Sequence, residues 1–582
     1  MQWYIILSFI LFTGVVAYYT FSKLRKERVK GKVSKDNYFL GGRSLTWGVI
    51  GMSLLLTNLN ATQFVGMSGQ SFAGNMSNMA YEVTSGFVLA LVAIYLLPRY
   101  LKQGITTIPE FLEDRYDSQV KSFVSILFLL GYVLNMLPTT LYSGAIALSQ
   151  MFDIESTFHI SYEAGIWIMV WLIGIIGFFY AVLGGLKAVA ISDTFNGVAL
   201  AIGGLLVPIF ALLTLGDGSI SQGFSQFVAA TPEKFNAIGT NHDVVPFGAA
   251  LTGLLLVNFY YWGTDQSIIQ RALAAKDLKE GQKGIMFVGL MKIFTPIIVI
   301  IPGIMAFQII GNTGANPDTM YSALVTEVMP KPLIGLFAAA MFGSVLSVFN
   351  GILNSASTLF AINVYAPTFG KNKSDEEIVR KGKWFGVFIA LISMFIAPLI
   401  MYAPSGLFQY LQVINGFFNV PIFTIIFIGY VTKRVPAIAA KIAITFFIAT
   451  YAILQLVVKP EMSFLYQLAI LFVISCLLML IIGKIKPREE AYVLPSRNLV
   501  NLDPWKYRQE AAWGMIFCVT AFYIVFSKLG LASEIGFGVH TWAWLAGAAL
   551  ICLIGLFVTK KIGNRTNTAE PLEKTTLNKN VL

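Results

Sequence analysis

The sequence predicts an all-α membrane protein that crosses the bilayer many times, with about 15 transmembrane helices. Hydrophobic residues make up 56% of its 582 residues, charged residues only 12%, and the mean hydropathy is +0.71. Soluble domains carry about 25% charged residues. The apolar residues form runs of about 20, the length that a helix needs to cross a bilayer. The cations, which exceed the anions by 11, collect in short loops between these runs and so do not indicate a nucleic-acid partner.

The expected spans follow one another along almost the whole chain. The first is too long for the core of a signal peptide and no small-residue cleavage site follows it, which predicts a retained helix. No stretch between spans is long enough for a separate catalytic domain, so the sequence does not predict an enzyme. The expected spans are residues 2–22, 46–72, 77–101, 120–152, 162–183, 187–215, 245–264, 283–311, 332–362, 380–402, 405–430, 436–458, 462–484, 511–528 and 539–559.

The distribution of Lys and Arg predicts the orientation in the membrane. The loop after the first span holds eight cations between Lys23 and Arg43, and the loops that alternate with it are also cation-rich. The remaining loops are poor in cations: the long loop 216–244 contains a single Lys or Arg, Lys234. Cytoplasmic loops carry the excess of Lys and Arg. We therefore expect a multi-pass protein of the plasma (inner) membrane with its N-terminus outside and its C-terminus in the cytoplasm.

A polar cluster interrupts the second expected span. Thr57-Asn58-Leu59-Asn60-Ala61-Thr62-Gln63 lies within the apolar run from Leu45 to Met67. Polar side chains are costly in the hydrocarbon core, and broken or polar stretches are tolerated where they line a cavity or are buried in protein. The cluster therefore predicts a binding site in a transporter. Hydrogen bonding between helices is the alternative.

Three further polar features lie inside expected spans. Glu82, with Tyr81 before it and Ser85 after it, is a carboxylate that faces a cavity or, alternatively, reaches the interface. The segment 258–263 (NFYYWG) combines an amide with aromatic rings, although an aromatic run is also typical of an interfacial belt. Lys292 lies about ten residues into its span, too deep to reach water easily, so its expected partner is Glu82 or a ligand oxygen.

Together these groups favour a neutral polyhydroxylated ligand. Sugar hydroxyls need both donors and acceptors, which Asn and Gln supply. The C–H face of a sugar ring packs on an aromatic ring, in a pocket with apolar walls and few polar groups. An amino-acid substrate would instead favour an open helix N-terminus and few acidic groups.

Several motifs make the chain similar to the sodium/solute symporter family, and within it to the bacterial sodium/galactose symporters. The similarity extends from about residue 1 to about residue 530, and the motifs occur in the family's order. They are Asp36–Leu45 (DNYFLGGRSL), Gln63–Gly69 (QFVGMSG), Thr107–Leu112 (TIPEFL), Gly184–Ala188 (GGLKA), Tyr260–Gly263 (YYWG), Ile269–Arg271 (IQR) and Gly351–Ser355 (GILNS).

The resemblance implies a core of two inverted five-helix repeats with the ligand at their interface, of the amino-acid-transporter type. The expected division is an N-terminal helix and basic loop (1–45), the first repeat (46–215), the second repeat (245–430), and four peripheral helices (431–560) with a linker at 484–509. A disordered cytoplasmic tail (561–582) follows.

The resemblance also implies roles for individual residues. It places Met67, Tyr81 and Phe408 in an outer hydrophobic gate, and Tyr261 in an inner gate that stacks on the sugar. For Met67 and Phe408, the residues alone favour ordinary core packing over a gate. The sugar would be held by Gln63, Glu82, Ser85, Asn258, Lys292 and Gln412, with Asn58 and Tyr261 beside them.

One coupling sodium ion is the cofactor that the resemblance implies. Its expected ligands are the carbonyls of Leu56 and Leu59 and oxygens of Ser344 and Ser347, with Asp193 near the ion path. The family usually has a serine where this chain has Val348, and valine offers only backbone oxygen to a hard cation. A second sodium site is therefore not expected.

The sequence favours sodium-coupled uptake of a hexose such as galactose or glucose by alternating access. The alternatives are a symporter for another small solute (polyol, sugar acid or amino acid) and an uncoupled or proton-coupled sugar carrier or sensor. The expected partners are a small-molecule sugar and the lipid bilayer, with no obligatory protein partner evident.

Overall fold

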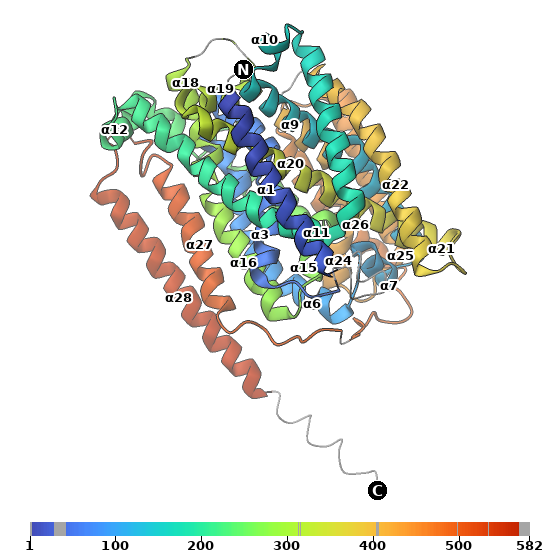
Figure 1. Ribbon diagram of the computed structural model, residues 1–582. Helices are drawn as coiled ribbons and strands as arrows, with labels where there is room; N and C mark the ends of the chain where they lie inside the picture. The colour runs from blue at the N-terminus through green and yellow to red at the C-terminus, as the bar shows by residue number, and fades with distance from the viewer. Residues whose placement is uncertain are drawn as a thin grey trace.

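The computed structural model describes residues 3–27, 42–311, 314, 316–402, 407–497, 499–533 and 535–569. Within these ranges, the side chains of residues 21, 23–27, 179–194 and 562–569 are outside the description. The described residues form helices and loops, and their only β pairing is two isolated bridges, Leu45 with Ala275 and Asp277 with Asn501. The all-α class expected from the sequence is confirmed (Figure 1).

The helices of the first half belong to the expected first span, the first repeat and the long loop that follows it. They are α1 (Trp3–Glu27), α3 (Trp47–Asn58), η2 (Gln63–Met67), α4 (Ser68–Ala73), η3 (Met76–Met79), α5 (Ala80–Leu91), η4 (Val92–Leu96), α6 (Leu97–Gln103), α7 (Ile108–Arg115), α8 (Ser118–Gly131), η5 (Tyr132–Met136), α9 (Leu137–Phe152), α10 (Ile154–Phe158), α11 (Tyr162–Leu215), α12 (Ile220–Ala230) and η6 (Pro232–Phe235).

The second half contains the expected second repeat and the peripheral helices. They are α13 (Phe247–Ala250), α14 (Gly253–Gly263), α15 (Gln266–Leu273), α16 (Leu278–Phe294), α17 (Pro296–Val299), α18 (Ile301–Ile309), η7 (Pro317–Thr319), α19 (Met320–Val328), α20 (Lys331–Leu359), η8 (Phe360–Tyr365), α21 (Ala366–Thr368), α22 (Asp375–Ile396), η9 (Ala397–Tyr402), α23 (Leu407–Gly416), α24 (Asn419–Val431), α25 (Ala437–Ile453), η10 (Leu454–Val458), α26 (Phe464–Ile485), α27 (Arg508–Val525) and α28 (Val539–Ala569).

Length and apolar composition identify membrane-crossing helices in the described part of the chain. Nine helices qualify, or eleven if each of two bent pairs forms one span. The bent pairs are Leu278–Phe294 with Pro296–Ile309, at 45°, and Leu407–Gly416 with Asn419–Val431, at 41°. The count of 15 stays a prediction, because several expected spans correspond to helices that are short or broken.

Helix α11 differs from its two expected spans, because it is continuous from Tyr162 to Leu215. A straight helix of 54 residues would be about 81 Å long, far more than the ~30 Å hydrocarbon core. Figure 1 shows that α11 descends from α10 and rises again towards α12, so it folds back on itself. Among the residues of α11 whose side chains are described, Phe195–Leu215 is long and apolar enough to cross a membrane, and Tyr162–Phe178 is a shorter apolar helix. The expected break at 183–187 is therefore a bend within helical backbone.

The first expected repeat begins with a helix that is broken inside the molecule. Helix α3 ends at Asn58, and π-helical η2 begins at Gln63. The Asn60 side chain serves both ends of the break: its Nδ2 donates to the Thr57 carbonyl (3.0 Å), and its Oδ1 accepts from the Thr62 N–H (2.8 Å). Asparagine caps helices in this way. The polar cluster therefore interrupts the helix in the interior of the protein.

The second expected repeat begins with an equivalent break between α14 and α15. The Asp265 carboxylate caps α15 by accepting from the Ser267 N–H (2.8 Å). Both breaks are buried, since Asn60 is 7% and Asp265 1% exposed. Two broken helices at equivalent places along the chain are the arrangement expected where an irregular backbone lines a binding cavity.

Helix α4, which continues the broken first helix after η2, packs against the irregular helical segment α17–α18. Close packing brings α18 so near to α4 that a Cβ added to Gly303 would lie 2.2 Å from the Ser68 carbonyl oxygen. Ser68 Oγ donates to the carbonyl of Val299, and Ser71 Oγ to that of Ile300 (2.8 Å). Small residues allow such approach between membrane helices, and serine hydroxyls occupy carbonyls freed by irregular turns.

Candidate functional site

A cavity of about 100 Å³ lies where the two broken helices meet. One wall comes from α3, η2, α5, α14 and α16, and the other from η5, α9, α20 and α23. Nine residues predicted from the sequence for the sugar site and its gates line this cavity. They are Asn58, Gln63, Tyr81, Glu82, Asn258, Tyr261, Lys292, Phe408 and Gln412.

A chain of polar contacts crosses the cavity wall from α5 to α14. Lys292 of α16 forms a salt bridge with Glu82 of α5, and its ammonium also donates to Asn58 Oδ1. Asn58 Nδ2 in turn donates to the Tyr261 hydroxyl (3.3 Å). Of the two partners expected for Lys292, the structure therefore shows Glu82. Both charged side chains are at most 2% exposed, and a buried charge needs such compensation.

Aromatic and amide groups surround the charged pair. The ammonium of Lys292 lies 5.9 Å from the centroid of the Trp262 ring, within the range of a cation–π contact. Asn258 Nδ2 donates to Thr84 Oγ1 (2.9 Å). Gln63 Oε1 is buried without a hydrogen-bond partner in the described part of the chain. A buried acceptor without a donor is costly, so this oxygen is suited to receive a ligand hydroxyl.

The cavity is electrically balanced. Among the described residues that line it, Glu82 and Lys292 alone carry charge, and they neutralise each other. The other polar lining groups are amides and hydroxyls. Such a cavity favours a neutral ligand with many hydroxyls over an anion or a cation, whose charge would have no counterpart.

Phe408 separates this cavity from a larger vestibule. The vestibule has a volume of about 480 Å³, and its walls include Gln70, Tyr142, Asp318 and Phe408. Phe408 therefore lines both spaces. Its ring packs edge-on against that of Tyr81, with centroids 5.1 Å apart. The gate roles expected for these two residues stay predictions.

Two predicted residues are not at the cavity wall. Ser85 is 1% exposed, and its hydroxyl donates to the carbonyl of Glu82 in its own helix (2.5 Å). Met67 is fully buried in the core, as the residue alone favours. Their position depends on how η2 and α5 are rotated, which the motif did not reveal.

Other cavity residues were not singled out from the sequence. Thr139 and Thr140 of α9 reach the wall, as do Asn415 and Asn419 at the bend between α23 and α24. The available signal was modest: a Thr-Thr pair after Pro138, and two amides inside expected span 405–430. Single polar residues in a span also serve helix packing, so this signal did not distinguish the two roles.

A sequence model of one protein family matches most of the chain. The sequence model of the sodium:solute symporter family matches residues 38–446. The chain belongs to this family. It is therefore a membrane transporter that couples movement of a solute to sodium, and it is not an enzyme.

Individual relatives support the assignment of this symporter. An uncharacterized symporter of Escherichia coli (strain K12), YidK, is 44% identical over 541 residues, which is 93% of each chain. The sodium/glucose cotransporter of Vibrio parahaemolyticus is 32% identical over 436 residues, covering 71% of this chain and 78% of that one. The sodium/myo-inositol cotransporter of Mus musculus is 26% identical over 441 residues, covering 69% and 60%.

A solved structure has the same fold. It is a substrate-bound, outward-open sodium-coupled sialic acid symporter, with a TM-score of 0.68 and 21% sequence identity. The likeness covers 83% of this symporter and 96% of that chain. At this identity it supports the fold, with its inverted repeats, and carries no information about the solute.

The residues predicted for the sodium site differ in how well they fit a cation. Ser347 Oγ is buried without a hydrogen-bond partner in the described part of the chain, so it is suited to coordinate an ion. The backbone hydrogen bonds at the break include neither the Leu56 nor the Leu59 carbonyl. Ser344 Oγ donates to the Met341 carbonyl (2.7 Å), which leaves its lone pairs available. Hard cations prefer such oxygens.

Two other positions bear on the ion. Val348 lines the solute cavity and offers no side-chain oxygen. Asp193 lies in the part of α11 whose side chains are outside the description, so its predicted place near the ion path stays a prediction.

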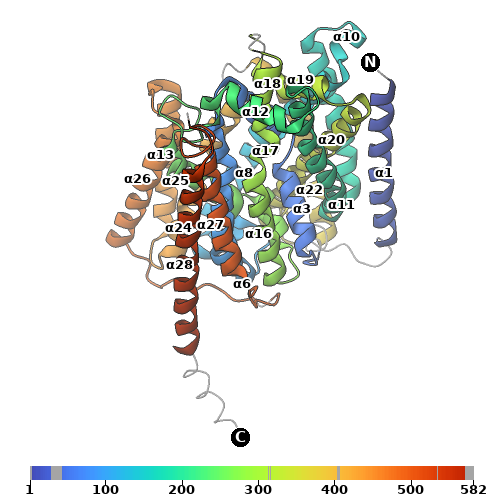
Figure 2. The same cartoon turned by 90° about the vertical axis from the view of Figure 1, so that its left-hand side faces the viewer.

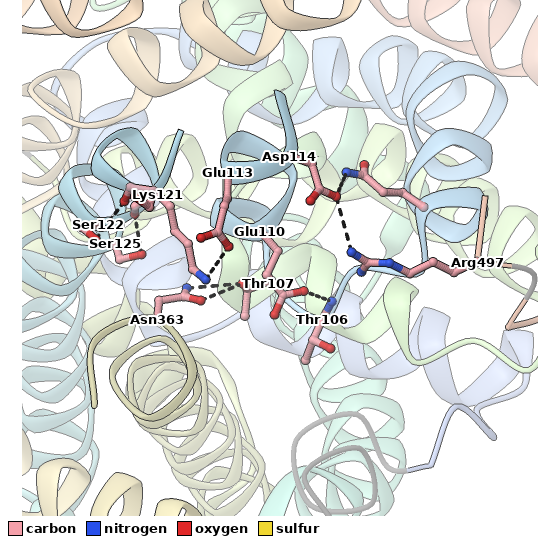
Figure 3. A network of polar contacts seen from close by, with 12 residues as sticks. Thr106, Thr107, Glu110, Glu113, Asp114, Lys121, Ser122, Ser125, Asn363 and Arg497 are labelled. Carbon is pink, nitrogen blue, oxygen red and sulfur yellow. Dashed lines mark hydrogen bonds and ion pairs between the residues drawn. The ribbon is translucent and has the colours of Figure 1, made fainter. Parts of the chain in front are cut away.

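A thick polar layer closes the symporter on the side opposite the vestibule. Gln266 of α15 accepts from the Ile108 N–H (2.9 Å) and donates to the Thr106 carbonyl (3.2 Å). Asn363 of η8 donates to Thr107 Oγ1 (3.2 Å), as Figure 3 shows. The segment that leads into α7 is thus tied to elements of the second expected repeat.

Helix α7 is itself anchored at both ends (Figure 3). Lys121 pairs with Glu113 at 2.6 Å, and Arg497 of the linker approaches Asp114 at 3.5 Å. The Thr106 N–H donates to Glu110 (2.8 Å), yet burial raises the pKa of the Glu110 carboxyl. The fully buried Arg115 donates to the carbonyls of Gly429 (2.9 Å) and Val435 (3.0 Å). Opening this face therefore requires movement of whole helices.

Asp265 is an important residue that the sequence analysis missed. Besides capping α15, its carboxylate accepts from Ser267 Oγ (2.5 Å) and from the hydroxyls of Tyr132 and Tyr260 (3.2 Å each). It thereby holds the α14–α15 break, which brings Tyr261 and Trp262 to the cavity. The available signal was an acid immediately after an apolar run, which also describes an ordinary loop.

Proposed function

We propose that this symporter takes up a neutral sugar, a hexose such as galactose or glucose, by alternating access. The observation that carries the proposal is the balanced cavity, in which the Glu82–Lys292 pair lies among Asn58, Gln63 and Asn258. A sugar acid would bring an unmatched negative charge into this site. A neutral polyol or hexose brings hydroxyls that pair with amide donors and acceptors.

In this proposal, Glu82 and Lys292 bind the sugar by exchanging part of their mutual contact for sugar hydroxyls. Charge-assisted hydrogen bonds are about twice as strong as neutral ones, so the exchange is favourable only for a ligand that satisfies both groups. Gln63, Gln412 and Asn258 orient the ring, and Tyr261 packs against it. The names of relatives agree with this class of solute: a sodium/glucose cotransporter in Vibrio parahaemolyticus and sodium/myo-inositol cotransporters in mammals.

Sodium binds, in this proposal, at the lower edge of the first helix break. The carbonyls of Leu56 and Leu59 meet Ser344 and Ser347 there, with Asp193 beside the ion path. The ion neutralises carbonyl dipoles at the end of α3 and so fixes Asn58 at the cavity wall. This is the link through which sodium raises sugar affinity, and by reciprocity sugar raises sodium affinity by the same factor.

The proposed orientation follows from the cation-rich end of the molecule. Helices α6, α7 and α15, with Arg99, Lys102, Arg115 and Arg271, lie at the lower end in Figure 1, and α1 begins at the upper end. Cations favour the cytoplasm. The vestibule then opens to the outside, in the plasma membrane. We assign the repeats to residues 46–215 and 245–430.

Uptake by vesicles that contain the purified symporter tests the function. An inward sodium gradient should drive labelled galactose or glucose above its equilibrium level, and a potassium gradient should not. One ion moving through 100 mV supplies about 2.3 kcal/mol, which corresponds to accumulation on the order of 50-fold. Uptake that ignores sodium would contradict coupling. Competition by myo-inositol but by neither hexose would move the substrate class to polyols.

Replacing Val348 by serine should lower the sodium concentration for half-maximal uptake. The new hydroxyl lies beside the proposed ion ligands, and a hydrogen-bonding group adds about 1.5 kcal/mol at a charged centre, or about tenfold in affinity. Ser347→Ala should raise the same concentration by a similar factor. Both are measured from the sodium dependence of initial uptake rates.

Val257→Ser is the matched control for this prediction. It introduces a hydroxyl into the same cavity from α14, away from α20, and should leave the sodium dependence unchanged. If neither Val348→Ser nor Ser347→Ala changed the sodium concentration for half-maximal uptake, the ion would lie elsewhere.

A further inference from the structure

An apolar groove of about 630 Å³ runs along the outside of the helical bundle between α16 and α27. Figure 2 shows these two helices side by side on the face turned to the viewer, with α28 beyond α27. Met286, Phe287 and Leu290 of α16 form one wall, and Met515 and Phe517 of α27 form the other. Gly514 forms part of the groove, and a Cβ added there would meet no atom within 4 Å.

The length of the groove matches one leaflet of a bilayer. Its walls run from Lys283 to Leu290 on α16 and from Ala511 to Cys518 on α27. Each stretch covers seven helical steps, about 10 Å. Half of a ~30 Å hydrocarbon core is about 15 Å. The groove therefore extends from one membrane interface most of the way to the bilayer centre.

The mouth of the groove has the features of an interface. Trp47 and Trp505 lie there, and tryptophan is enriched at the level of lipid headgroups. This end of α16 and α27 is the cation-rich end of the molecule, at the bottom of Figure 2. The groove thus opens at the headgroup level of the leaflet on that side.

Four cations, Lys283, Lys506, Arg508 and Lys560, and three carboxylates lie around this mouth. Lys283 lines it, and Lys506 and Arg508 lie beside Trp505, whose carbonyl accepts from Arg508 (3.1 Å). Each of the three carboxylates has a partner, and the partner of Glu280 is Lys283 itself, at a long 3.5 Å. Glu280 also accepts from the Trp47 N–H (2.9 Å); Glu510 pairs with Lys560 (2.8 Å), and Asp503 accepts from Asn501 (3.0 Å).

We propose that this groove is a binding site for a phospholipid with an anionic headgroup. One acyl chain lies between α16 and α27, and the phosphate is held at the mouth by Lys283, with Lys506 and Arg508 around it. Basic sites between helices on the cytoplasmic side bind such headgroups. The apolar walls, the leaflet-matched length and the charge at one end all select this occupant.

The bound lipid supports the helix that carries Lys292. Gly289 of α16 packs so closely on α27 that an added Cβ would lie 2.1 Å from Met515 Cε. Lys292 follows one turn later in α16. A chain in the groove fills the space beside this contact and keeps α16 and α27 together as one body.

Native mass spectrometry of the purified symporter tests the site. The probes are phosphatidylglycerol and phosphatidylcholine with identical chains. Wild type should retain one phosphatidylglycerol more tightly than phosphatidylcholine. Gly514→Trp, which fills the groove, should abolish this bound lipid of either kind. Lys283→Gln should reduce the preference for phosphatidylglycerol about fivefold, because one cation near an anionic headgroup contributes about 1 kcal/mol.

Two matched variants control for general effects. Gly547→Trp places the same side chain at an open position of α28 and should retain the lipid. Lys279→Gln removes a cation one turn before Lys283 in α16, outside the groove, and should leave the preference for phosphatidylglycerol unchanged. Lipid retention by Gly514→Trp would overturn the proposal. So would equal affinity of wild type for the two headgroups.

Discussion

Replacement of Lys292 by methionine is expected to abolish sugar binding and to lower the free energy of unfolding by about 3–5 kcal/mol. The physical reason is that Glu82, 2% exposed, would be left as a buried charge without its partner, and Asn58 would lose its donor. Glu82→Gln alone should also abolish sugar binding, because Lys292 would lose its counter-ion. Thermal unfolding in detergent measures the stability, and equilibrium binding of labelled sugar measures the site.

The double variant separates the structural and binding roles of the pair. Lys292→Met with Glu82→Gln removes both charges, so most of the lost stability should return, since a buried ion pair contributes little net stability over apolar groups. Sugar binding should stay absent. Restored sugar binding in the double variant would show that the pair only holds the fold. Full stability in the Lys292→Met single variant would show that water reaches Glu82.

Asp265→Ala is expected to lower the free energy of unfolding by about 3 kcal/mol or more and to abolish transport. It removes the cap of α15, worth about 1 kcal/mol, and leaves two buried tyrosine hydroxyls without their acceptor at about 1 kcal/mol or more each. The α14–α15 break would relax, and Tyr261 and Trp262 would leave their places at the cavity. Thermal unfolding and sodium-driven uptake measure the two effects.

Two further variants separate the capping role of Asp265 from its other contacts. Asp265→Asn keeps an accepting oxygen and an efficient cap, so it should lose about 1 kcal/mol and retain partial transport. Asp277→Ala removes the equivalent cap of α16, which accepts from the Glu280 N–H (2.8 Å) in a half-buried place, and should cost about 1 kcal/mol with transport intact. Equal effects of Asp265→Ala and Asp277→Ala would assign Asp265 a capping role alone.

The place of the binding cavity was predictable because polar groups are expensive inside a membrane. The cluster at 57–63, Glu82 and Lys292 each stood out against an apolar background, and the structure brings members of all three to one cavity. The contact between Glu82 and Lys292, 210 residues apart, was one of two partners expected for the ammonium. The contacts of Asn58 with Lys292 and Tyr261 were not predicted.

Residues at the edges of apolar runs were harder to interpret. Asp265 follows Gly263 and Thr264, a composition that also suits a loop at the membrane surface, so its burial became visible only in three dimensions. The same ambiguity affected α11, where one expected span ends at residue 183 and the next begins at residue 187, yet the backbone stays helical through the bend. Local composition determines that the chain turns there but does not determine whether hydrogen bonding is interrupted.

The two faces of the cavity are closed by barriers of unequal thickness, so we expect the two faces to open at different rates. On the vestibule side the expected barrier is two aromatic rings, Phe408 and Tyr81. On the other side α7, α15 and η8 must separate together. Side-chain rotations are fast, whereas collective helix movements take microseconds to milliseconds. We therefore expect solutes to exchange between cavity and vestibule many times before the opposite face opens once.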